Sequence, residues 1–262
     1  NPAWKRFETR FAQAGGAGII SATINVDEKR WSPLEYPKLS HDRFIQPIQH
    51  VVRAVQAFDC RYIIQLGDPG YHTQSSLFAQ PEDNKSASNG FDLVFGYGNR
   101  RIAMTTGEVE RAVQQFIEAA RRARETGCDG LEITAAKGYL IHQFLNPATN
   151  QRTDRYGGSI ARRFQFLREI VEGVRQAVGA ELLFGVKLSA MDHNYLPVNI
   201  RWPIVFPLRH FFEGNGLTET IYYAKELAHL GVDYLHITNG FGFINPKDRT
   251  GAGPGAEFRL YA

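Results

Sequence analysis

Residues 131–159 read LEITAAKGYLIHQFLNPATNQRTDRYGGS, and this stretch decides the fold. Its first residues continue an apolar run from Gly130 to Thr134, which is typical of a buried strand. The run ends abruptly in a turn that carries Thr134, Lys137 and Tyr139. Enzymes built from alternating strands and helices place their catalytic groups where parallel strands end. We therefore predict a strand followed by a polar site.

Similar apolar runs, separated by amphipathic stretches, occur along the chain. The predicted strands cover residues 17–21, 61–66, 130–134, 182–188 and 232–238, and the predicted helices cover 4–14, 40 or 42 to 58, 105–127, 159–178 and 218–230. This alternation predicts an α/β fold with a parallel sheet covered by helices. About five strands are visible against the eight of a TIM barrel, and a doubly wound sheet also fits the alternation.

Composition narrows the class of protein. The chain has 262 residues, a net charge of +3 and scattered basic side chains, so a nucleic-acid partner is not expected. No long apolar run predicts a membrane span, and no His/Cys cluster predicts a metal site. The two cysteines, Cys60 and Cys128, do not suggest disulfides, which favours a reducing, cytoplasmic setting.

Two long segments between the predicted elements are candidates for function. Residues 67–104 are too long for a bare connector and predict a functional loop or small subdomain. Residues 190–216 are rich in aromatic and basic side chains and predict a lid over the site. His193, Arg201 and Trp202 would then contact an anionic or aromatic substrate. Aromatic side chains packed into an ordered surface excursion are an equally fair interpretation.

The string GYLIHQFLNPATNQRTDRYGGS closely resembles the signature of the Old Yellow Enzyme family of FMN-dependent oxidoreductases. Weaker matches are GGAGII, IIQLGDPG, GVKLSA and GVDYLHITNG, so the resemblance covers nearly the whole chain. It implies a (β/α)₈ TIM barrel, bound FMN, and NADH or NADPH as the reductant. It also implies that residues 1–262 form one partial FMN-binding domain. The first strand would precede Asn1, and the last two strands would follow Ala262.

Several roles follow from the resemblance. Gln65 matches a glutamine that hydrogen-bonds the flavin pyrimidine, and Lys187 stands where the family has an arginine near flavin N1 and O2. A flavin contact after the preceding strand falls at Ala22 or Thr23. Tyr139 matches a tyrosine that delivers a proton to the substrate, although a ring that only packs over the turn is the simpler alternative.

The resemblance fails at the residues that usually bind substrate. Family ene-reductases carry a His-x-x-His or His-x-x-Asn pair where this chain has Thr134 and Lys137. Lys137 could stabilise enolate charge or bind an anionic substrate, with Thr134 as an auxiliary donor. We expect an NAD(P)H-dependent reductase of activated alkenes such as α,β-unsaturated carbonyls. An amine or alcohol dehydrogenase or demethylase, and a catalytically degenerate flavin-binding or structural protein, remain open alternatives. Assembly into a homo-oligomer also stays open.

Overall fold

The computed structural model describes residues 2–30, 37–75, 84–94, 97–192 and 214–240. Its main sheet contains six parallel strands, which are β1 (Gly18–Ile20), β2 (Ile24–Asn25), β3 (Arg61–Gly67), β7 (Gly130–Ala135), β8 (Leu183–Ser189) and β9 (Tyr234–Thr238). Each of the five predicted strands is confirmed, and β2 is a short addition that also pairs with β3.

The strand order in the main sheet is β1-β3-β7-β8-β9, and β2 pairs with β3 off this path. Along that path, each strand lies beside the main-sheet strand that follows it in the sequence. A doubly wound sheet would reverse its order at a switch point, whereas a barrel does not. The sequential order therefore excludes the doubly wound alternative and matches a TIM barrel. Within the described residues the sheet does not close, because the order begins at β1 and ends at β9.

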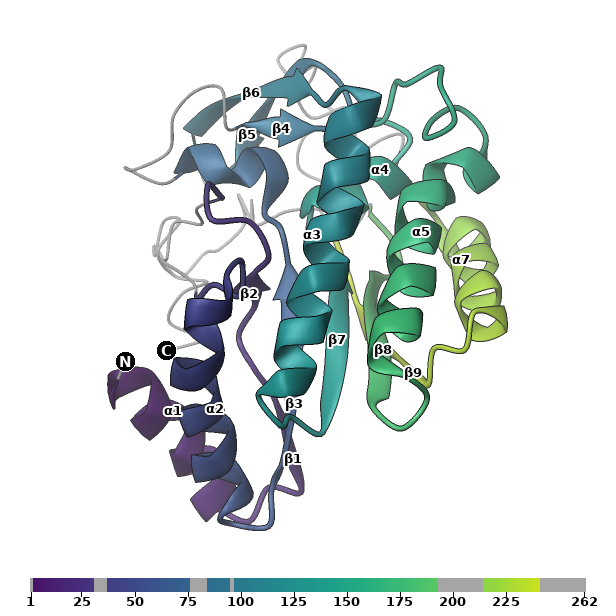
Figure 1. Ribbon diagram of the computed structural model, residues 1–262. Helices are drawn as coiled ribbons and strands as arrows, with labels where there is room; N and C mark the ends of the chain where they lie inside the picture. The colour runs from purple at the N-terminus through teal and green to yellow at the C-terminus, as the bar shows by residue number, and fades with distance from the viewer. Residues whose placement is uncertain (1, 31–36, 76–83, 95–96, 193–213, 241–262) are drawn as a thin grey trace, which may run out of the picture.

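Helices connect the strands and cover one side of the sheet (Figure 1). They are α1 (Pro2–Gln13), α2 (Ile45–Gln56), α3 (Thr106–Glu125), α4 (Leu140–Leu145), α5 (Ile160–Val178) and α7 (Leu217–His229). A capping box begins α3, because Thr105 and Glu108 each bond the other's backbone N–H. The predicted start of α2 is wrong. Its first turn is the 3₁₀ helix η1 (Asp42–Phe44), and His41 is the capping acceptor.

Alternation along the strands separates two faces of the sheet. On β7, Leu131, Ile133 and Ala135 are fully buried in the hydrophobic core. Glu132 and Thr134 therefore project from the opposite, concave face. The core lies between the sheet and its helices, and polar side chains gather on the inner face.

A second, smaller sheet occupies part of the segment 67–104. It contains β4 (Lys85–Ser86), β5 (Gly90–Val94) and β6 (Tyr97–Ala103), and the 3₁₀ helix η2 (Gly70–Ser75) precedes it. The sheet packs against η2 and α4, beyond the carboxyl end of β3, at the top of Figure 1.

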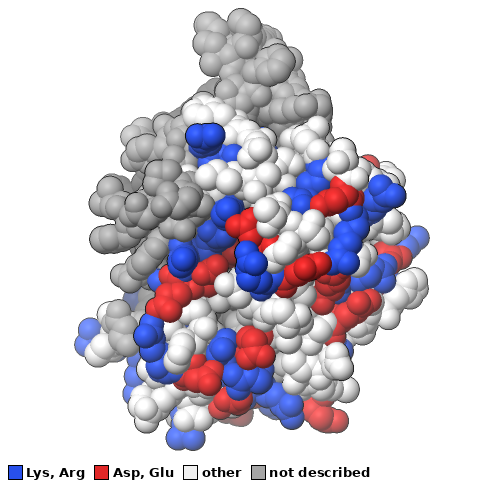
Figure 2. Space-filling view, turned by 45° about the horizontal axis from the view of Figure 1, so that its top comes forward, with Lys and Arg blue, Asp and Glu red and all other residues white. Residues whose placement is uncertain are grey.

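Charges of both signs are interspersed over the face that Figure 2 shows. Many of them are paired, as Arg122 is with Asp42 at 2.7 Å. In the described part of the chain, no helix combines the length and the apolar character needed to cross a membrane.

Candidate active site

The inner face of the sheet carries polar side chains at two successive levels. At the lower level, Gln65, Glu132, Gly185 and Tyr234 are in register on β3, β7, β8 and β9. Toward the carboxyl ends of the strands, Thr134, Lys187 and His236 form the next level. Three candidate residues, Gln65, Thr134 and Lys187, thus lie on neighbouring strands. They face the end of the sheet where TIM barrels carry their active sites.

The Gln65 carboxamide is held at both ends. Thr23 donates its hydroxyl proton to Gln65 Oε1 over 2.5 Å, and Gln65 Nε2 donates to Glu132 Oε1 over 2.7 Å. Gln65 and Thr23 are buried, whereas Ala22 is exposed beside them. The structure thus brings Gln65 and Thr23 into direct contact and leaves Ala22 able to offer only its backbone or methyl group.

Glu132 is the residue that sequence reasoning missed. Its side chain has no solvent exposure and accepts from Gln65, from Tyr234 at 3.1 Å and from His236 at 3.2 Å. A lone carboxylate inside an otherwise apolar strand is costly to bury unless it is paired, and this was the available signal. Burial and the nearby Glu132 charge raise the pKa of Tyr234, so its phenol stays a proton donor.

Lys187 and Thr134 are adjacent donors with different surroundings. Burial lowers the pKa of the Lys187 ammonium, and the negative charge of Glu132 opposes that effect. Thr134 is 3% exposed, and its hydroxyl has no hydrogen-bond partner among the described residues. A buried hydroxyl without a partner is uncommon, so this edge of the sheet presents a donor to whatever occupies the space above it.

The turn after β7 has a specific backbone shape. Lys137 adopts a φ of 56°, and Gly138 follows with a φ of 74°. A left-handed lysine costs free energy, so neighbouring contacts must maintain it. The Lys137 ammonium donates to the backbone carbonyl of Asn239 over 2.8 Å, just past β9. Lys137 therefore spans the strand ends, and this hydrogen bond lies at the exposed edge of the site.

Tyr139 occupies the N-cap position of α4 and is 5% exposed. Its ring makes an edge contact with His72, whose centroid lies 6.0 Å away. Leu140 donates its backbone N–H to the carbonyl of Asp68, which joins the turn to the end of β3. Tyr139 is thus part of the same cluster of strand ends as Lys137 and Gln65.

His142 and Asp192 support the turn after β7 through hydrogen bonds. Gly138 donates its N–H to His142 Nδ1 over 2.9 Å, and His142 Nε2 lies 2.8 Å from Asp192 Oδ1. Burial opposes ionisation of Asp192, but His142 and hydrogen bonds from Asn215 and Asn146 outweigh it and lower its pKa. His142 is 2% exposed, so this pair is buried beneath the turn.

Asp68 is a further buried carboxylate, just past the end of β3. Its carboxylate lies 3.4 Å from the Arg30 guanidinium. Burial raises the pKa of Asp68, although Arg30 opposes this. A buried carboxylate–guanidinium pair therefore lies at the end of β3.

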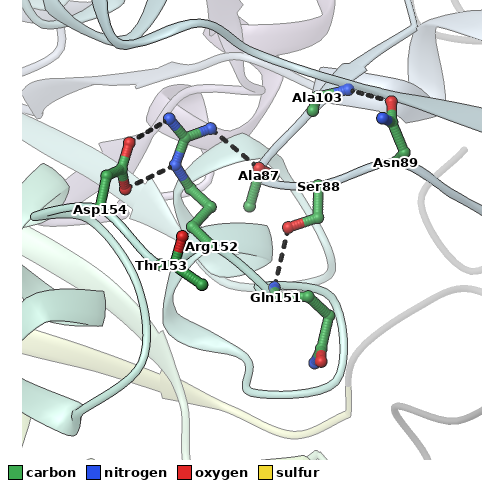
Figure 3. Close-up of a pocket in the computed structure, with 8 residues that line it drawn as sticks. All are labelled: Ala87, Ser88, Asn89, Ala103, Gln151, Arg152, Thr153 and Asp154. Carbon is green, nitrogen blue, oxygen red and sulfur yellow. Dashed lines mark hydrogen bonds and ion pairs between the residues drawn. The ribbon is translucent and has the colours of Figure 1, made fainter.

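The loop from Asn146 to Ser159 fixes the small sheet against the barrel. Arg152 pairs with Asp154 and donates to the carbonyls of Ala87, at 3.0 Å, and Met104. Figure 3 shows the Arg152 fork between Asp154 and Ala87, beside a hollow of about 430 Å³. These contacts join the loop to the small sheet through the Arg152 side chain.

Some of the predicted site residues fall on parts of the chain that the structure does not describe. His193, Arg201 and Trp202, and most of the predicted lid at 190–216, lie outside the described residues. Among the described residues, no group of three or more His, Cys, Asp or Glu side chains could hold a metal ion.

The fold and the polar strand ends define a TIM-barrel protein with its candidate site at the usual catalytic edge. A model of the NADH:flavin oxidoreductase / NADH oxidase family matches residues 3–197. The chain belongs to this family, whose members are enzymes that use FMN and NADH or NADPH. The resemblance to Old Yellow Enzyme is thereby confirmed.

Curated relatives agree with this assignment. The chain is 35% identical over 242 residues to the probable NADH-dependent flavin oxidoreductase YqiG of Bacillus subtilis, covering 90% of this chain and 58% of YqiG. It is 32% identical over 233 residues to a metal reductase of Desulforamulus reducens, covering 88% of this chain and 32% of that protein. The chain thus spans between a third and three fifths of the length of these relatives.

Solved structures share the fold. Morphinone reductase in complex with tetrahydroNAD superposes with a TM-score of 0.71 at 26% identity, covering 89% of this chain and 64% of that one. Histamine dehydrogenase from Rhizobium sp. 4-9 gives a TM-score of 0.76 at 22% identity, covering 91% of this chain and 32% of that one. At that identity the second likeness shows the barrel fold alone.

Proposed function

We propose that the protein containing this chain binds FMN at the carboxyl edge of the sheet and uses NADH or NADPH to reduce an activated alkene. The substrate would be an α,β-unsaturated carbonyl or a related electron-poor molecule. The observation that carries this proposal is the row of donors on neighbouring strands. Thr134 and Lys187 project from the inner face toward the strand ends, and Gln65 projects from the level just below them.

These donors fit the group that the family uses. Gln65 retains one N–H and one carbonyl lone pair after its contacts with Thr23 and Glu132, which suits the donor and acceptor edge of a flavin pyrimidine. The Lys187 ammonium is half-buried beside the Glu132 charge, where it could face an electron-rich ring. Bound FMN supplies the hydride transfer, and a cation beside it stabilises the negative charge of its reduced form.

The turn after β7 would act on the substrate. Lys137 would bind the carbonyl oxygen of the unsaturated substrate and stabilise the enolate charge that develops on that oxygen. An anionic group on the substrate would be attracted by the same ammonium. Tyr139 would hold a proton at its phenol oxygen and deliver it to the substrate carbon opposite the hydride. Thr134 would add a neutral donor.

One observation favours a second function. The histidine pair is absent, and Lys137 donates to a backbone carbonyl. An amine or alcohol dehydrogenase or demethylase would run the flavin chemistry in the opposite direction and would not need the usual pair. A protein that binds flavin without catalysis is the third alternative.

We place the protein in the cytoplasm, because both cysteines of this chain are unpaired.

The visible spectrum of the full-length protein tests these alternatives. Flavin that is bleached anaerobically by NADH or NADPH and restored by an enone supports the reductase. Bleaching by an amine or alcohol alone supports the dehydrogenase, and bound flavin that neither reagent changes supports the degenerate protein. Absence of flavin would contradict both enzyme functions.

The variant Lys137→Met tests the role of the turn after β7. It should raise KM for an enone or slow its reduction, and unchanged turnover would remove Lys137 from the mechanism.

A further inference from the structure

Glu132 lies on the inner face of β7, in register with Gln65 on β3 and one level below Thr134 and Lys187. Its carboxylate accepts hydrogen bonds from Gln65 on β3 and from Tyr234 and His236 on β9. We infer that Glu132 is a positioning residue, which sets the direction in which the Gln65 carboxamide faces the flavin. This inference rests on the flavin site described under the proposed function.

The chemistry of its two neighbours determines how Gln65 is oriented. A carboxylate can only accept hydrogen bonds, so Gln65 must turn its nitrogen toward Glu132. Its oxygen then faces Thr23, whose hydroxyl donates to it over 2.5 Å. A glutamine without such neighbours could present either end to a ligand, because rotation of the amide exchanges donor and acceptor. Glu132 removes that choice before any ligand binds.

Glu132 is itself held from the opposite side. Tyr234 reaches it from β9 by crossing over β8, where Gly185 lies in register between the two. A Cβ on Gly185 would lie 2.1 Å from the Tyr234 ring, so only glycine leaves room for this crossing. Gly185 and Tyr234 together thus keep the carboxylate turned toward Gln65.

A purely structural role for Glu132 makes a different prediction. If the residue only satisfies buried donors, its replacement would weaken the fold and reduce flavin binding regardless of which side chain is at position 65. If it acts through Gln65, its effect must disappear when the Gln65 amide is removed. A double-mutant cycle separates these two cases.

The test uses the full-length protein with Glu132→Gln, Gln65→Leu and the double variant, and it measures the Kd for FMN by quenching of flavin fluorescence. We expect Glu132→Gln to weaken binding about tenfold, as for the loss of a charge-assisted hydrogen bond, and to have no further effect beside Gln65→Leu. Riboflavin should show the same ratios, because the inferred contact is with the ring. An unchanged Kd in Glu132→Gln, or equal losses in both backgrounds, would overturn the inference.

Two further variants test the same arrangement. Tyr234→Phe removes a donor that holds the Glu132 carboxylate in place, so it should raise the Kd for FMN by less than Glu132→Gln does, and this loss should also vanish beside Gln65→Leu. Thr23→Val removes the other partner of the amide and tests the same orientation if Glu132→Gln does not fold; its loss should also vanish beside Gln65→Leu. Wild-type protein that binds no flavin would contradict the proposed function itself, whereas flavin binding that is indifferent to Glu132 and Thr23 would contradict only this inference.

Discussion

His142 and Asp192 form a buried pair, with 2.8 Å between Nε2 and Oδ1, although 50 positions separate them in the sequence. The backbone N–H of Gly138 points at His142 Nδ1, so that nitrogen must be an acceptor. In the neutral ring the proton is then on Nε2, which donates to Asp192. The pair joins the turn after β7, which carries Lys137 and Tyr139, to the segment after β8.

Loss of this pair should weaken both fold and function. We expect His142→Ala to lower the free energy of unfolding by about 3 kcal/mol, because Asp192 would remain buried with fewer partners. Reduction of an enone should slow as well, since the Lys137 turn would lose its support. Urea denaturation measures the first effect and steady-state kinetics the second. His50→Ala is the matched control on an exposed histidine, and a loss no larger than that of the control would contradict the supporting role.

Glu8 provides a test of pH dependence away from the site. It is 2% exposed on α1, accepts from the Trp4 indole at 2.9 Å, and has a raised pKa because burial disfavours its charge. The folded state therefore binds the proton more tightly than the unfolded state does. The stabilisation is fully present below the ordinary glutamate pKa, about 4.3, and is lost as pH rises through the higher folded value.

Glu8→Gln should remove this dependence. The amide oxygen can still accept from Trp4, and no charge is buried at neutral pH. We expect the variant to be more stable than the wild type at pH 7, with a difference that shrinks toward zero at acidic pH. Thermal unfolding across the pH range measures this, with Glu118→Gln on exposed α3 surface as the control. A difference that is independent of pH would contradict the assignment.

We expect that lysine cannot replace Arg152 without a loss of stability. Its guanidinium bonds Asp154 through two nitrogens and also reaches the carbonyls of Ala87 and Met104. Lysine has no planar fork and cannot make these contacts together. We expect Arg152→Lys to lower the free energy of unfolding by about 2 kcal/mol. Arg162→Lys on the exposed surface of α5 should change it by less than about 0.5 kcal/mol, and equal values for the two variants would contradict the role of Arg152.

Local sequence patterns predicted most of the fold. The apolar runs located every described strand of the barrel except β2, and the predicted helix at 105–127 matches α3. Strand order could not be read from these patterns, because pairing is set by contacts between distant segments. The register that places Thr134 beside Lys187 was therefore visible only in the structure.

The site was harder to predict for the same reason. Glu132 looked like one polar residue in an apolar strand, and only the partners on β3 and β9 show why a charge is tolerated there. His142 and its partner Asp192 follow different strands, so no local pattern links the two residues. Gln65 and Lys187 were named from the family motifs, and their flavin contacts stay predictions.

Tyr139 separates the two half-reactions of the proposed enzyme. Its phenol would protonate the substrate and would have no part in accepting electrons from NADH or NADPH. We expect Tyr139→Phe to leave flavin reduction by the nicotinamide within about twofold of wild type and to slow flavin reoxidation by an enone about 100-fold. Anaerobic stopped-flow absorbance records each step separately. Tyr222→Phe, on a half-buried tyrosine in α7 that packs against Phe164, is the matched control for loss of a phenol oxygen. Equal slowing of both half-reactions would show that Tyr139 only shapes the turn, and an unchanged reoxidation rate would assign the proton to another donor.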